Sequence, residues 1–90
     1  MSVETPEYLA MMRRMIRAAG RRVAGADPED LAQLVELRDA LDAAIADAVA
    51  GQREMGSSWA DIARGLGCTR QSAHERFGVR ATLTEDRRAS

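Results

Sequence analysis

The chain has 90 residues and a net charge of −1, and this length fits one small domain and leaves no room for a second. Its hydrophobic fraction of 46% includes seventeen alanines, so large apolar side chains are scarce and a single chain can build only a thin core. One cysteine and one histidine exclude an internal disulfide and a zinc site of their own, and no apolar run reaches the ~18 residues of a membrane span. We therefore expect a cytoplasmic protein without metal or cofactor, and the all-Arg basic residues are typical of a GC-rich bacterium.

The charges form three blocks along the chain. Residues 1–26 carry five Arg and two Glu, residues 27–50 carry seven acids and one Arg, and residues 51–90 carry seven Arg and five acids. Because the near-neutral total hides blocks of opposite sign, the chain can still present a basic face to a polyanion. The alternative, that the basic and acidic blocks pair across packed helices, stays open for the N-terminal block.

The first predicted helix covers 5–24. The sequence Thr-Pro-Glu at 5–7 is a helix start, with Thr5 as N-cap and the proline at the first helical position. Apolar residues then recur at helical spacing as far as Val23, while the arginines lie largely on the other side. The methionines at 11–15 are interpreted as core filling or as an adaptable docking surface.

The second predicted helix covers 27–55, with Asp27 as N-cap, Pro28 at the first position and Gly56 as the C-terminal cap. Its apolar stripe has the alternating spacing of three and four that is typical of a coiled coil, which predicts a homodimer. An antiparallel hairpin with the first helix inside one chain is the alternative, and both can hold together. The predicted dimerisation residues are Leu34, Leu37, Leu41, Ile45 and Ala48. The acidic stretch 28–50 is also a possible surface for a protein partner.

Two short helices are expected in the C-terminal part of the chain, over 57–79. Ser58 with Asp61 three residues later forms a capping box, and Gly67 supplies the turn after the third helix. Thr69 caps a fourth helix that ends at Gly78, and residues 80–90 are expected to form a flexible tail. Trp59 is expected to pack against the long second helix.

The stretch 59–78, WADIARGLGCTRQSAHERFG, resembles the helix-turn-helix of bacterial and phage transcriptional regulators, including the promoter-reading module of sigma factors. It has a small residue, Ala63, where two helices touch, a glycine in the turn and apolar residues on the inner side of each helix. Cys68 follows the turn at a position that the motif buries. The sequence departs from the motif at Ala73 and near Arg76, where branched aliphatic residues are usual, and Phe77 is the candidate to replace that packing.

The resemblance implies that the fourth helix enters the major groove of double-stranded DNA. By their match to the motif, five residues are expected to contact DNA: Thr69, Arg70, Gln71, His74 and Glu75. Three further arginines are candidates for phosphate contacts: Arg64, Arg76 and Arg80. Arg can pair with guanine, Gln with adenine and Glu with cytosine, while a hydroxyl at a helix start can hold phosphate.

Other chemistry is disfavoured by spacing. Ser72 and His74 are two residues apart on one helix and cannot face each other, so they do not form a nucleophile and base pair. Cys68 and His74 lack further metal ligands. We therefore expect no enzymatic activity.

These observations predict an all-α protein in which a helical hairpin is followed by a C-terminal helix-turn-helix. The expected function is sequence-specific DNA binding in transcription regulation, as a homodimer. The alternative is an adaptor or antitoxin-like protein that binds a protein partner, such as polymerase, through its hairpin. The target DNA sequence and the direction of regulation do not follow from the sequence.

Overall fold

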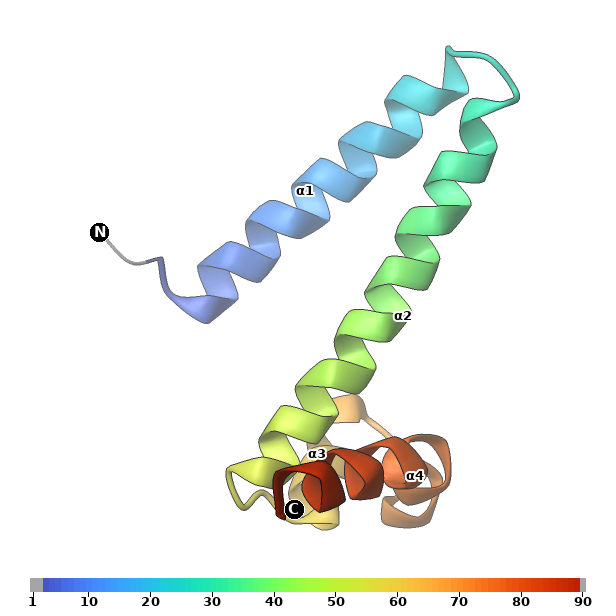
Figure 1. Cartoon of the computed structure of the whole chain (residues 1–90). Helices are drawn as coiled ribbons and strands as arrows, with labels where there is room; N and C mark the ends of the chain where they lie inside the picture. Colours follow the sequence, from blue (N-terminus) through green and yellow to red (C-terminus); the bar gives the residue numbers. More distant parts are fainter. Residues whose placement is uncertain (1–2, 90) are drawn as a thin grey trace. The chain divides into compact units, whose positions relative to one another are not determined.

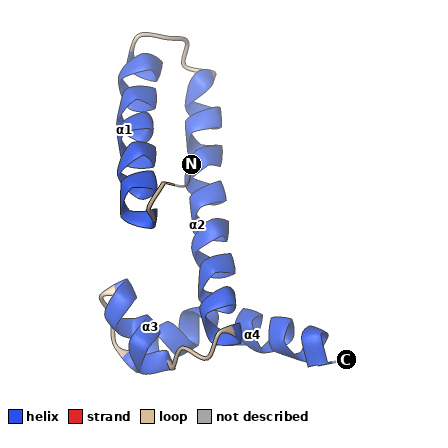
Figure 2. Ribbon diagram, turned by 90° about the vertical axis from the view of Figure 1, so that its left-hand side faces the viewer, coloured by secondary structure: helices blue, strands red, loops and turns tan. Residues whose placement is uncertain are grey.

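The computed structural model of the chain describes residues 3–89, with side chains for 3–79. Within this range all regular structure is helical and there is no strand, as expected (Figures 1 and 2). The helices are α1 (Thr5–Ala24), α2 (Asp30–Glu54), α3 (Trp59–Leu66) and α4 (Arg70–Ala89). The chain divides into two compact units, Met1–Asp39 and Ala40–Ser90.

The first unit contains α1 and the beginning of α2, and the predicted helix starts differ slightly from those observed. Glu4, rather than Thr5, is the N-cap of α1, and a proline follows in the first turn. Before α2, the Asp30 N–H donates to the Asp27 carbonyl at 3.0 Å, a bond of the i→i+3 type. Because this turn is tighter than an α-helix, α2 begins at Asp30 and not at 27.

The apolar side chains of the first unit are largely uncovered. No residue of α1 is buried. Tyr8 is 51% exposed and Met15 59%, and on α2 Leu31 is 55% and Leu37 51% exposed. This unit therefore presents apolar surface on both of its helices.

In the second unit, α2 and α3 end with the same backbone motif, which depends on a glycine. Gly56 and Gly67 have φ of +99° and +73°, in the left-handed region that favours glycine. After each glycine, the next N–H returns to a carbonyl five residues earlier, from Ser57 to Gln52 and from Cys68 to Ala63, both at 3.0 Å. These bonds satisfy carbonyls at the helix ends, as in a Schellman motif. Both glycine predictions are confirmed.

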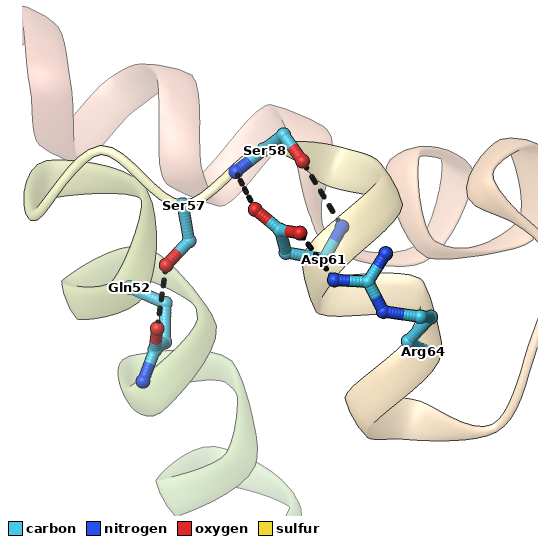
Figure 3. A network of polar contacts seen from close by, with 5 residues as sticks. All are labelled: Gln52, Ser57, Ser58, Asp61 and Arg64. Atoms are coloured by element: carbon cyan, nitrogen blue, oxygen red, sulfur yellow. Dashed lines mark hydrogen bonds and ion pairs between the residues drawn. The ribbon is translucent and has the colours of Figure 1, made fainter.

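The predicted capping box at the start of α3 is confirmed, and its bonds are reciprocal (Figure 3). The Asp61 N–H donates to Ser58 Oγ at 3.0 Å, and the Ser58 N–H donates to Asp61 Oδ2 at 3.1 Å. Arg64 also donates to the Asp61 carboxylate. Next to the box, Ser57 Oγ donates to Gln52 Oε1 of α2 at 2.7 Å, which holds the connection to the end of α2.

The core of the second unit is small and rich in alanine. The buried cluster consists of Val49, Ile62, Ala63 and Ala73. Partly buried side chains pack against this cluster: Trp59, Leu66, Cys68 and Phe77. Ala73 has no exposed surface. Because Ala63 of α3 and Ala73 of α4 belong to the same cluster, the two helices pack against each other through small side chains. Cys68 is free, half-buried and packed against the core, as the sequence indicated.

The predicted end of the fourth helix at Gly78 is wrong, because α4 continues to Ala89 (Figure 1). A glycine inside a helix costs only about 1 kcal/mol relative to alanine, so it does not by itself end one. No proline follows Gly78 to interrupt the backbone hydrogen bonds. Residues 80–89, which were expected to form a tail, therefore belong to α4.

The capping box makes the stability of the second unit depend on pH. The Ser58 backbone N–H, followed by the Ser58 hydroxyl and Arg64, lowers the pKa of Asp61 from its ordinary value of 3.8. Folding therefore favours the ionised carboxyl, whose contribution is present above that value and lost as the pH falls through the lowered pKa. We predict that Asp61→Asn lowers the melting temperature at pH 7 and that the difference from wild type shrinks below pH 3.8. Thermal unfolding from pH 7 to 2 tests this, and a constant difference would contradict it.

The contact at Ala73 leaves no room for a larger side chain. We predict that Ala73→Leu destabilises the chain by about 1–3 kcal/mol, because overpacking a filled core forces side chains and backbone apart. The matched control is Ala60→Leu, since Ala60 is an exposed alanine on α3. Chemical denaturation measures both variants. An equal, small change in the two would show that the α3–α4 contact tolerates bulk.

Candidate functional site

The start of α4 is organised by Thr69. The Ser72 N–H donates to Thr69 Oγ1 at 3.1 Å, so the threonine caps the helix as predicted. A hydroxyl that accepts this bond keeps its own proton for donation to a further oxygen. Arg70 follows as the first residue of α4 and is exposed. Free N–H groups and a guanidinium therefore lie together at the positive end of a helix.

Four of the predicted DNA-contacting residues share one exposed face of α4. Three of them follow the first, Arg70, by one, four and five residues, so all four side chains lie on the same side of α4 in adjacent turns. Together with Trp59 they line a shallow hollow on the surface of the second unit. We call these four residues, Arg70, Gln71, His74 and Glu75, the outer face of α4. The inner side of the helix carries Ala73 and Phe77, which pack toward the core.

Two members of the outer face hold each other. Gln71 Nε2 donates to Glu75 Oε1 at 3.0 Å. A glutamine amide has two N–H groups and one carbonyl, so Gln71 retains a donor and an acceptor for a further partner. The bond restricts both side chains, and this lowers the entropy that they lose when they bind a ligand.

His74 connects α4 to α3 through Trp59. The two ring centroids lie 5.2 Å apart with an angle of 77° between the planes, which is an edge-to-face arrangement. The imidazole also lies over Gly78, where an added Cβ would be 3.2 Å from three atoms of the ring. The sequence predicted that His74 contacts DNA or lies on a solvated helix surface, whereas in the structure its ring also packs against Trp59.

Trp59 was expected to contact the long helix, and it does so while remaining half-buried. The guanidinium carbon of Arg53, on α2, lies 5.2 Å from the centroid of the Trp59 ring. Arg53 Nη1 also donates to the Ser57 carbonyl at 3.1 Å. Trp59 was not predicted to line the site, because nothing in the sequence gives the direction of α3 relative to the outer face of α4.

Two of the three predicted phosphate-contacting arginines, Arg64 and Arg76, do not line the hollow beside the outer face. Arg64 pairs with Asp61 on α3, and 75% of its side chain is exposed. The guanidinium carbon of Arg76 lies 5.1 Å from the Phe77 ring centroid, and Arg76 lines a second hollow with Asp42 and Ile45 of α2. The side chain of Arg80 lies outside the described residues.

The predicted dimerisation residues differ in exposure. Leu37, Leu41 and Ala48 are exposed, whereas Leu34 and Ile45 are half-buried. Ile45 lines the second hollow with Arg76 and Phe77. Most of the stripe is therefore open to a partner.

No protein-family model, curated protein or solved structure matches the chain. Among the described residues, no group of three His, Cys, Asp or Glu side chains gathers in a way that suits a metal ion. None of the helices within that range has the length and apolar character needed to cross a membrane.

The contact between His74 and Gly78 predicts an unusual response to alanine. Gly65→Ala, where nothing lies within 4 Å of the added Cβ, should stabilise the chain by about 0.5–1 kcal/mol through helix propensity. Gly78→Ala should gain less, because the His74 ring must move, and the fluorescence of Trp59 should change. Thermal unfolding and emission spectra measure both effects.

A double variant separates the contact from the backbone. In a His74→Ala background the ring is absent, so adding Gly78→Ala should raise the stability by the full amount expected from helix propensity. An equal gain for Gly65→Ala and Gly78→Ala, with unchanged emission, would refute the contact.

Proposed function

We propose that this chain is a small sequence-specific DNA-binding protein that regulates transcription as a homodimer. The observation that carries the proposal is the outer face of α4, where an arginine, an amide, an imidazole and a carboxylate share the exposed side of a capped helix. In the proposal, α3, the turn at 67–69 and α4 act as a helix-turn-helix, with α4 in the major groove.

The side chains of the outer face suit the edges of base pairs. Arg70 can donate two hydrogen bonds to guanine, and Gln71 can donate to and accept from adenine. Glu75, which already accepts from Gln71, can accept from the amino group of cytosine. The cap at Thr69 leaves its hydroxyl proton for a phosphate oxygen at the helix start.

The small residues between α3 and α4 support this docking. Ala63 and Ala73 are both buried in one cluster, so α3 and α4 pack closely against each other. This packing fixes the orientation of the outer face of α4 relative to α3. A recognition helix needs such support, because its side chains must reach base edges with errors well below 1 Å. Residues 51–90 carry seven Arg and five acids, which gives this half a modest positive charge for the phosphates.

A second candidate function rests on a different observation. Leu37 and Leu41 of α2 are exposed within a strongly acidic stretch, and apolar side chains in this setting suit a protein partner. An adaptor that binds a protein such as polymerase through α2 would use the C-terminal helices for protein contacts. DNA binding by this adaptor would be weak and independent of sequence.

Site selection from random duplex DNA tests the proposal. We predict that wild type selects an inverted repeat whose half-sites lie about 34 Å apart, one turn of DNA, because a dimer presents two copies of α4. Arg70→Ala and Gln71→Ala should each relax the preference at one position of the half-site, at a cost of about 1–3 kcal/mol.

The control is Arg76→Ala, since Arg76 does not line the hollow beside the outer face. It should leave the selected sequence unchanged, lower the affinity for all sequences alike and reduce the salt slope by about one. Wild type without any sequence preference at low salt would overturn the proposal in favour of the adaptor.

A further inference from the structure

The apolar face of α1 is the largest feature that the proposed function leaves unused. Its members recur at helical spacing on one side of α1: Tyr8, Leu9, Met12, Met15 and Ile16. All five are exposed, from Met12 at 37% to Met15 at 59%. We infer that this face binds the acidic segment 27–39 of a second copy of the chain. The inference rests on the proposed homodimer and specifies which helices meet in it.

The same unit carries the matching apolar surface. Leu31, Leu34 and Leu37 recur every three residues on one side of the start of α2, where Leu31 and Leu37 are 55% and 51% exposed and Leu34 is half-buried. Within one chain no residue of α1 is buried and Leu34 of α2 is only half-buried, so packing inside the unit leaves much of both surfaces open to water. A second copy supplies for each surface the partner that its own chain does not.

Charge decides between the possible pairings of α1. Helix α1 carries five Arg and only Glu7, whereas the segment 27–39 carries five acids and only Arg38. Pairing α1 with α1 of the second copy would join two helices of net positive charge, and pairing two acidic segments would join two segments of net negative charge. Pairing α1 with the acidic segment instead joins two segments of opposite net charge.

Two-fold symmetry makes this pairing close on itself. If α1 of one copy binds the acidic segment of the other, the symmetry axis repeats the contact with the roles exchanged. The contact then forms twice in the dimer, so α1 and the acidic segment of each copy are both covered and no free surface recruits a third copy. The methionines suit this contact, because their unbranched side chains fit against leucines of another helix.

Crosslinking between single-cysteine variants tests which helices meet. In a Cys68→Ala background, one protein carries Met15→Cys on α1 and a second, labelled with ¹⁵N, carries Leu31→Cys on α2. After unfolding and refolding together, a thiol-specific bismaleimide should crosslink the two proteins to each other. Each protein alone should give far less crosslinked dimer, which mass spectrometry quantifies.

Other crosslinks identify other pairings and would overturn the inference. Efficient dimer formation by the Met15→Cys protein alone indicates α1 against α1, and by the Leu31→Cys protein alone indicates two acidic segments. A variant with both cysteines that crosslinks only within one chain indicates an intramolecular hairpin.

Sedimentation separates failure of this inference from failure of the proposed homodimer. Met15→Glu should raise the dissociation constant of the dimer at least about tenfold, because it places a carboxylate in an apolar contact. The control Ala18→Glu adds the same charge at an exposed alanine outside the apolar face. Circular dichroism checks that both variants keep their helices.

Each outcome has a distinct meaning. A wild-type dimer that Met15→Glu leaves intact overturns the inference and keeps the homodimer of the proposed function. A wild-type monomer overturns both. Because site selection on DNA is measured separately, sequence-specific DNA binding stands or falls independently of these results.

Discussion

The close approach of α3 and α4 at Ala63 and Ala73 is the constraint on which the second unit depends. Ala73 is fully buried, and the cluster that it joins contains no large side chain other than Val49 and Ile62. These methyl groups bury little area, but because they are small they allow α3 and α4 to pack close together. That distance brings Trp59 against His74 and defines the hollow beside the outer face of α4.

The parts of the fold that could be predicted from sequence are those encoded by neighbouring residues. Ser58 and Asp61 form the capping box, and Gly56 and Gly67 end their helices, because caps and turns depend on spacing along a few residues. The end of α4 could not be predicted in this way. Gly78 reads as a helix end in sequence, whereas in the structure it lies inside α4 beneath the imidazole of His74.

In the candidate site, too, the features set by spacing along one helix could be predicted, and those set by packing between helices could not. Helical spacing alone predicts that Arg70, Gln71, His74 and Glu75 share a face, and the structure places them around one hollow. The place of Trp59 beside them could not be predicted, because it depends on how α3 crosses α4. Likewise, the pairing of Arg64 with Asp61 follows from their spacing on α3 but competes with the phosphate role that the motif suggested.

The small core has a consequence for the folded population of the protein. The buried apolar residues of the described chain are Val49, Ala50, Ile62, Ala63 and Ala73. A unit with so little buried area has a small free energy of unfolding, so local opening is frequent on the timescale of amide hydrogen exchange. Any ligand that binds only the folded form adds RT ln(1 + [L]/Kd) to that free energy. The folded fraction of the second unit therefore rises with the concentration of whatever the unit binds, and exchange rates of its amides report that occupancy.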